Sequence, residues 1–215
     1  MKRIPTELKD CFIIEPDKFG ADRGYFSPYF IQDNFDKELE FAGVVQTNRS
    51  MSSKGVLRGL HFQVGDKCQT KIVEVIHGAA IDVVVDIRKG SPTFGKSTSV
   101  LLTQDNNRQL FVPRGFAHGF ISLKDDTVFQ YLIDNDYAPS LEGGILWNDP
   151  KFNINWDEIF KEYEIDSPSL SEKDKLRKML GDENNYFLYK EGNLGNMVPD
   201  YENTYRDYPS IRERK

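Results

Sequence analysis

Short stretches in which apolar and polar residues alternate, separated by turn sequences, fill the chain from about residue 44 to residue 156. In the clearest stretch, residues 80–87, isoleucine or valine stands at every second position, so that these side chains share one face. The connecting sequences, such as Pro113-Arg114-Gly115, consist of residues that favour turns. Because no longer helical pattern lies between the stretches, the sequence predicts an all-β sandwich or barrel.

The predicted strands are residues 71–76, 80–87, 98–102, 109–112, 119–123 and 127–133. The first two are expected to form a hairpin across His77-Gly78, because glycine accepts positive φ. Helix is expected only towards the ends of the chain, over residues 36–41, 157–163 and 171–180.

The composition is that of a globular protein with an acidic surplus, since 28 Lys and Arg stand against 34 Asp and Glu. A length of 215 residues suffices for one domain with a sizeable core. The acidic balance and the lack of a dense basic cluster argue against nucleic-acid binding. No apolar run approaches the ~20 residues that span a bilayer, and no apolar stretch follows the first basic residues. We therefore expect a cytoplasmic protein without membrane contact.

Tyrosines gather in the last part of the chain, where the residues after Gly181 hold five of the ten, among Asn, Asp, Glu and Arg. A charged tail is usually disordered, but this aromatic content is high for a purely solvated segment. We expect residues 1–180 to form the β domain and residues 181–215 to form a C-terminal extension. The extension either packs against its own barrel or a partner subunit, or stays unpacked.

A metal site is not expected from the three histidines and two cysteines. Jelly-roll metal sites need three or four His or Glu ligands, and His61 lacks a second histidine two residues on. His77 falls in a predicted turn, where a solvent-exposed side chain is expected. Cys11 and Cys68 have neither metal spacing nor the number needed for a disulfide framework.

Arg58 and His61 lie three residues apart, so a regular strand over these residues would place them on opposite faces. A bulge at Gly59 would let both point inward. The alternative is an exposed arginine and a buried histidine without a ligand. Lys71 and Tyr131 also have alternatives to a role in a site: Lys71 can be a solvated lysine at the start of a strand, and Tyr131 can be a core residue.

Nine short motifs in collinear order cover about residues 1–180 and together resemble the dTDP-4-dehydrorhamnose 3,5-epimerase family. They are DRGYF at 22–26, QTNRS at 46–50, GVLRGLHFQ at 55–63, DVVVD at 82–86, SPTFG at 91–95, RQL at 108–110, GFAHGF at 115–120, WNDP at 147–150 and LSEKD at 170–174. The resemblance implies a cupin-type jelly roll (double-stranded β-helix) with short terminal helices, working as a homodimer without cofactor or metal.

The resemblance also implies a reaction, the epimerisation of the carbons that flank the 4-keto group of a nucleotide-diphosphate 6-deoxy sugar. The expected substrate is dTDP-4-dehydro-6-deoxy-glucose, in deoxysugar biosynthesis of the rhamnose type. Inverting such a carbon requires a base on one face, an acid on the opposite face and stabilisation of the enolate between them.

By the family pattern, His61 matches the base and Asp174 the carboxylate that orients it. Tyr131 matches the opposing acid, and Lys71 matches the cation at the enolate oxygen. Asp174 has an alternative role, because Ser171-x-x-Asp174 also fits a capping box at the start of the last helix.

The remaining matched positions are expected to bind substrate. Arg23 and Arg58 match the residues that hold the diphosphate, which a planar guanidinium can grip through two oxygens. Gln46 and Asn48 match polar pocket residues, and His118 is expected in the same pocket.

The chain departs from the family at three positions. Pro28 stands where the family commonly has a glutamate on the nucleotide side, which leaves the base of the nucleotide open. Arg114 replaces a frequent glutamate, and Leu132 replaces the lysine that usually follows the catalytic tyrosine.

Because of these departures, two alternative functions remain open. One is an epimerase for a GDP- or CDP-linked 4-keto hexose or heptose, or one that inverts a single carbon. The other is a non-catalytic protein that binds a sugar nucleotide or takes part in an assembly. This second alternative predicts that His61, Tyr131 and Lys71 are scattered over different surfaces.

Overall fold

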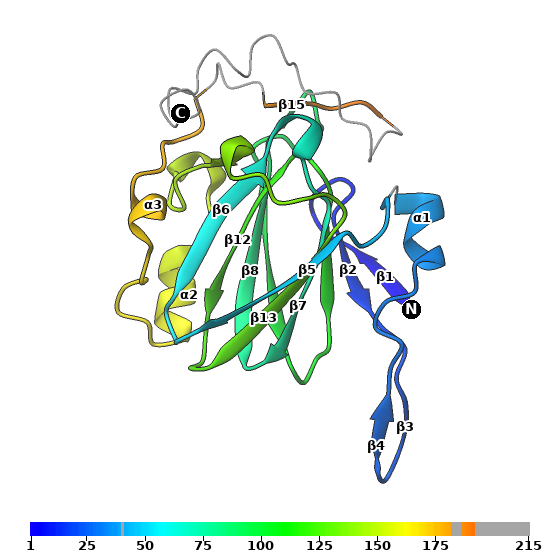
Figure 1. Cartoon of the computed structure of the whole chain (residues 1–215). Helices are drawn as coiled ribbons and strands as arrows, with labels where there is room; N and C mark the ends of the chain where they lie inside the picture. The colour runs from blue at the N-terminus through cyan, green and yellow to red at the C-terminus, as the bar shows by residue number, and fades with distance from the viewer. Residues whose placement is uncertain (40, 182–185, 192–215) are drawn as a thin grey trace.

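Two antiparallel β-sheets face each other in the computed structural model, which describes residues 1–39, 41–181 and 186–191 (Figure 1). The six-stranded sheet has the order β1 (Lys2–Pro5), β2 (Phe12–Glu15), β11 (Gln109–Val112), β7 (Lys71–His77), β13 (Thr127–Ile133), β5 (Gln46–Ser52). The five-stranded sheet has the order β10 (Ser97–Thr103), β8 (Ala79–Asp86), β12 (Phe116–Ser122), β6 (Leu57–Gln63), β14 (Glu142–Gly144). This arrangement confirms the predicted all-β fold, a cupin-type jelly roll.

Two strand pairs lie outside these sheets. Strands β3 (Phe19–Ala21) and β4 (Gly24–Phe26) form a hairpin that projects from the body, and β9 (Arg88–Lys89) pairs in parallel with β15 (Phe187–Leu188) (Figure 1). The helices are short: α1 (Asp33–Leu39), α2 (Trp156–Glu162), α3 (Glu172–Lys175), and the 3-10 turns η1 (Gly65–Lys67), η2 (Pro139–Leu141) and η3 (Pro150–Phe152). Within the described ranges, none of the helices is long and apolar enough to cross a membrane.

The alternating pattern located the central strands well, and β11 and β13 have the predicted bounds. The predicted hairpin across His77-Gly78 is wrong. Strand β7 pairs with β11 and β13, whereas β8 pairs with β10 and β12. Gly78, at φ +83°, turns the chain from one sheet into the other and lies so close to Thr127 that a Cβ would be 2.5 Å from its Oγ1. A glycine corner can therefore change sheets as readily as it can close a hairpin.

Three hydrophobic clusters hold these layers together. One fills the space between the sheets, with residues such as Val84 and Phe129. A second lies on the outer face of the five-stranded sheet, where α2 packs, and a third lies under α1 on the six-stranded sheet (Figure 1). The five-stranded sheet is thus covered on both faces, which explains why every residue of β8 is buried.

The terminal helices were expected in about the right places, but the predicted helix over residues 171–180 is wrong beyond its first turn, α3. Tertiary contacts draw the following residues away from a helical path. Arg177 donates to Glu142 at 2.7 Å, and the amide of Leu180 donates to Asp149 at 2.8 Å. Of the predicted extension, residues 186–191 pack on the body, and residues 182–185 and 192–215 lie outside the described part.

Candidate active site

A pocket of about 600 Å³ is lined by residues of both sheets, mainly from β5, β6, β12 and β13. It is lined by eight of the nine residues that the sequence predicted for the site: His61, Tyr131, Asp174, Lys71, Gln46, Asn48, Arg58 and His118. The ninth, Arg23, does not line it. Residues that lie up to 128 positions apart in the chain are brought together here, since Gln46 and Asp174 share the same cavity.

A bulge in β6 brings Arg58 and His61 to the same side. His61 lies opposite His118 of β12, but Arg58 lies opposite Phe120, so β6 holds one extra residue between these pairs. Gly59 has φ +132°, and a Cβ there would lie 2.5 Å from the backbone of β12. Only glycine suits this conformation and close approach, so of the two alternatives left open by the sequence the structure has the bulge at Gly59.

His61 is held by a carboxylate, since its Nε2 lies 2.5 Å from Oδ1 of Asp174. Burial favours the protonated form of Asp174, which is 3% exposed, but its hydrogen bonds with His61 and Ser171 outweigh this and hold its pKa below the usual range. Ser171 also caps α3, because its Oγ accepts a hydrogen bond from the amide of Asp174 at 3.1 Å. The same short helix therefore uses its cap to fix the carboxylate that contacts His61.

The segment before α3 lies alongside β6, which explains how Asp174 reaches this histidine. The amide of Leu57 donates to the carbonyl of Ser169 at 2.9 Å, and the amide of Ser169 donates to the carbonyl of Gly55 at 2.8 Å. These bonds fix the approach of the chain into α3.

The opposite wall of the pocket comes from the six-stranded sheet. Tyr131 lies directly across from Asn48 in the β13–β5 pair, and burial raises the pKa of its phenol, which keeps it protonated. Gln46 lies two residues before Asn48 on the same face of β5 and donates to its Oδ1 at 2.6 Å. Lys71 begins β7, and burial lowers its pKa to about 8 although the charges of Asp82 and Glu142 favour the ammonium form.

A second histidine–carboxylate pair lies in the five-stranded sheet, where β12, the neighbour of β6, holds His118 and the next strand, β8, holds Asp82. Nε2 of His118 is 2.8 Å from Oδ2 of Asp82, and both residues are buried. Burial raises the pKa of Asp82, although the hydrogen bond and charge of His118 oppose this effect. The charge of Asp82 favours the ammonium form of Lys71, which lines the same pocket as His118.

The lining residues that were not predicted as site residues include a linked group of three, Glu142, Tyr137 and Lys173. Glu142 accepts hydrogen bonds from Tyr137 at 2.8 Å and Arg177 at 2.7 Å, and its carboxylate lies 2.5 Å from Nζ of Lys173. Burial opposes ionisation of Glu142, but Lys173 and Tyr137 together lower its pKa. Only Lys173 carried a sequence signal, because it stands next to Asp174 in the motif at 170–174.

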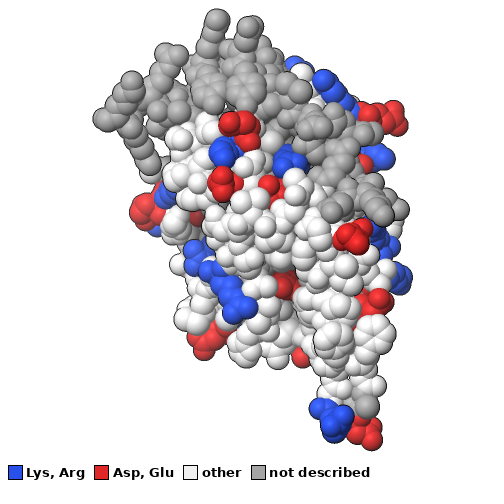
Figure 2. Space-filling model, turned by 45° about the vertical axis from the view of Figure 1, so that its right-hand side comes forward, with Lys and Arg blue, Asp and Glu red and all other residues white. Residues whose placement is uncertain are grey.

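Arg23 lies in the turn of the β3–β4 hairpin, which extends away from the body and carries charged side chains at its tip (Figure 2). The three departures from the family pattern, Pro28, Arg114 and Leu132, also lie outside the pocket. Arg114 forms a buried ion pair with Asp134 at 2.7 Å, and Leu132 packs against the cluster under α1. Neither of these two departures changes the lining of the cavity.

Comparison with known proteins gives one consistent result. The family model described as dTDP-4-dehydrorhamnose 3,5-epimerase matches residues 5–182. The Escherichia coli K12 protein of that name is 50% identical over 157 residues, which cover 73% of this chain and 85% of the relative.

Solved structures agree. The crystal structure of dTDP-4-dehydrorhamnose 3,5-epimerase from Elizabethkingia anophelis is similar with TM-score 0.78 and 43% identity, covering 86% of this chain and 98% of the other. That of the Legionella pneumophila dTDP-6-deoxy-D-glucose-3,5-epimerase in complex with dTDP-4-keto-L-rhamnose has TM-score 0.78 and 38% identity, covering 88% and 98%.

Proposed function

The chain belongs to the dTDP-4-dehydrorhamnose 3,5-epimerase family and is an isomerase, and we propose that its pocket inverts carbons 3 and 5 of dTDP-4-dehydro-6-deoxy-glucose. One observation supports the proposal that the pocket is the site of this reaction. His61 and Tyr131, a candidate base and a candidate acid, come from the two facing sheets and line the same cavity.

Epimerisation beside a ketone consists of two proton transfers through an enolate. His61 takes the proton from carbon 3 or carbon 5, and Asp174 stabilises the imidazolium that results. Since Nε2 bonds to Asp174, Nδ1 is the nitrogen that accepts the proton. Tyr131 then donates its phenolic proton to the opposite face of the same carbon. No electrons are transferred to or from the protein, so the two steps require no redox cofactor.

Lys71 stabilises the enolate between these two steps. Its ammonium group lies in a partly desolvated pocket, where a charge interacts more strongly with a developing oxyanion than it would in water. Arg58 binds the diphosphate, and Gln46 and Asn48 form the polar wall beside it. A few basic side chains therefore suffice for an anionic ligand in an acidic protein.

The non-catalytic alternative finds no support, because His61, Tyr131 and Lys71 gather in one pocket rather than on separate surfaces. The choice among substrates is tested by an exchange assay in deuterium oxide, followed by proton NMR, with dTDP-, GDP- and CDP-linked 4-keto-6-deoxy sugars. We expect label at both carbons and an inverted product for the dTDP sugar alone. Label at a single carbon, or turnover of another nucleotide, would favour the alternative epimerases.

We further propose that the protein is a homodimer in which the β3–β4 hairpin serves the pocket of the other subunit. Phe19 and Phe26 lie directly opposite each other in this hairpin and are 60% and 68% exposed. Burying these two rings against a second subunit would remove apolar surface from water and so favour the dimer. Arg23 lies beyond them at the tip, away from its own pocket, so a second subunit would reconcile its position with its expected diphosphate contact.

Mixing two inactive variants tests this exchange of hairpins. In a heterodimer of Arg23→Ala and His61→Ala subunits, the pocket that keeps His61 receives the intact hairpin of the other subunit. An equal mixture after subunit exchange should recover roughly a quarter of the wild-type sites, because half of the dimers are mixed and each has one intact site. Each variant alone is the control, and a mixture no more active than the two variants apart would contradict the proposal.

A further inference from the structure

Residues 186–191 pack on the outer side of the strand that carries His61. Their short strand β15 pairs in parallel with β9, and the amide of Tyr189 donates to the carbonyl of Lys89 at 2.9 Å. The side chain of Phe187 is 0% exposed and belongs to the hydrophobic cluster on the outer face of the five-stranded sheet. This segment is thus part of the packed body, although the match to the family model ends at residue 182.

Phe62, the neighbour of His61 in β6, is the contact point. The ring of Tyr186 lies 5.0 Å from that of Phe62, centroid to centroid, and the ring of Phe187 meets it edge-on at 5.9 Å. On β14, a Cβ on Gly143 would come within 2.3 Å of the Phe62 ring, so the ring fills the space over this glycine. Phe62 is therefore confined both by β14 and by the C-terminal segment.

Adjacent residues of a strand point to opposite faces. The side chains of Phe62 and His61 therefore extend from the same short piece of β6 backbone in opposite directions, so a displacement of one affects the other. The ring of Phe62 packs in the outer cluster, and the residue also belongs, with His61, to those that line the pocket. A loosened Phe62 ring would allow β6 to shift under His61. Because a misplacement of about 1 Å can cost roughly a hundredfold in rate, even a small shift would be measurable.

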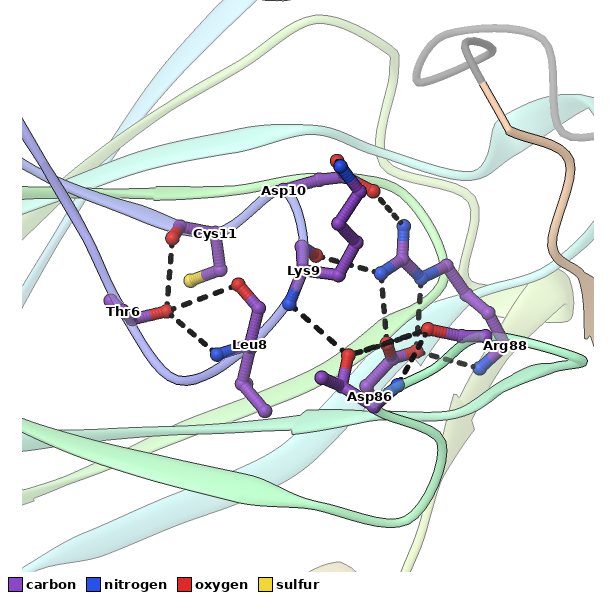
Figure 3. Close-up of polar contacts among 9 residues, drawn as sticks. Thr6, Leu8, Lys9, Asp10, Cys11, Asp86 and Arg88 are labelled. Atoms are coloured by element: carbon purple, nitrogen blue, oxygen red, sulfur yellow. Dashed lines mark hydrogen bonds and ion pairs between the residues drawn. The ribbon is translucent and has the colours of Figure 1, made fainter.

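The C-terminal segment packs beside β9, where a buried polar network surrounds Arg88 (Figure 3). The guanidinium of Arg88 donates to Asp86 at 2.8 and 2.9 Å, to Asp10 at 2.8 Å and to the carbonyl of Lys9 at 2.7 Å. Its planar group lies 4.3 Å from the ring centroid of Phe116 and 5.0 Å from that of Tyr189. These hydrogen bonds hold Arg88 in place, and with it the backbone of β9 that pairs with β15.

We propose that Phe187 is a positioning residue for the His61–Asp174 pair, acting through Phe62, and that residues 186–191 complete the catalytic domain. This inference rests on the proposed role of His61. It also assigns a function to the described part of the predicted extension.

The test compares Phe187→Ala with Leu188→Ala in the full chain, at a temperature at which both variants are folded. Leu188 is the matched control, because it lies in the same strand but is 37% exposed. For Phe187→Ala we expect kcat to fall about tenfold while KM changes less than about twofold. The NMR signal of the His61 ring proton bonded to Asp174 should shift or broaden in the same variant. Phe187→Leu should recover most of the rate, and Leu188→Ala should resemble the wild type.

Other outcomes distinguish the role of Phe187 from the proposed role of His61. A Phe187→Ala variant with reduced melting temperature but unchanged kcat and unchanged His61 signal would assign the segment a purely structural role and overturn the inference. Equal losses in Phe187→Ala and Leu188→Ala would overturn it as well. If His61→Ala itself retained deuterium exchange, the proposed function would fail, whatever the behaviour of Phe187.

Discussion

Replacing His61 by alanine should abolish the incorporation of solvent deuterium at carbons 3 and 5 of the dTDP sugar. Both exchanges start with removal of a proton, and His61 is the proposed base, oriented by a carboxylate 2.5 Å from its Nε2. Loss of a positioned general base typically costs about 10²–10⁴-fold in rate. The measurement is the rate of label incorporation followed by proton NMR, at an enzyme concentration high enough to detect a residual rate at the lower end of this range.

The chain offers a matched control in His77, which is exposed at the end of β7. His77→Ala should exchange deuterium at the wild-type rate. The substitution of His61 is expected to leave the fold intact, because the imidazole is partly exposed and its removal leaves Asp174 bonded to Ser171. A folded His61→Ala variant that exchanges normally would show that another group removes the proton.

Replacing Tyr131 by phenylalanine should slow epimerisation about a hundredfold and should slow the first exchange much less. The base can still remove a proton, but the enolate then lacks a donor on the opposite face, so the proton returns from the face that it left. Burial raises the pKa of the phenol and keeps it in the proton-donating form. The phenyl ring preserves the contact with Phe129, whose centroid is 6.4 Å away.

Tyr137 provides the control for this experiment, because it lines the same pocket and its hydroxyl donates to Glu142. Tyr137→Phe should change exchange and epimerisation by similar factors. The ratio of product formation to deuterium incorporation, measured in one NMR time course, separates the two variants. A ratio that is unchanged in Tyr131→Phe but lowered in Tyr137→Phe would make Tyr137 the acid.

Local sequence patterns predict the strands of this protein but not how they pair. The alternation in residues 71–76 and 80–87 predicted both strands, but a period of two says only which side chains share a face. It does not say which strands pair, so Gly78 was interpreted as a hairpin turn rather than as the corner between two sheets. The helix after Ser171 is short for a related reason, since contacts of Arg177 and Leu180 with distant residues override a local preference.

In the site, too, some residues could be predicted from local sequence and others could not. Residues with a family motif, such as His61 and Asp174, could be predicted because they stand at matched positions in ordered motifs. Glu142 and Tyr137 could not, because their importance comes from a hydrogen-bond network between β14, α3 and the loop before η2. The motif of Arg23 alone predicts it as a site residue, and in the structure Arg23 does not line the pocket of its own chain.

By itself, the sequence determined the all-β class, the positions of the central strands and eight of the residues that line the pocket. These properties depend on local periodicity, turn chemistry and motif identity, which neighbouring residues encode. The tertiary structure alone decided that His61 and Tyr131 face one cavity from opposite sheets, and that Phe187 packs behind the strand of His61. Such relations join residues far apart in the chain, and their geometry is set by the packing of whole sheets, which no local pattern contains.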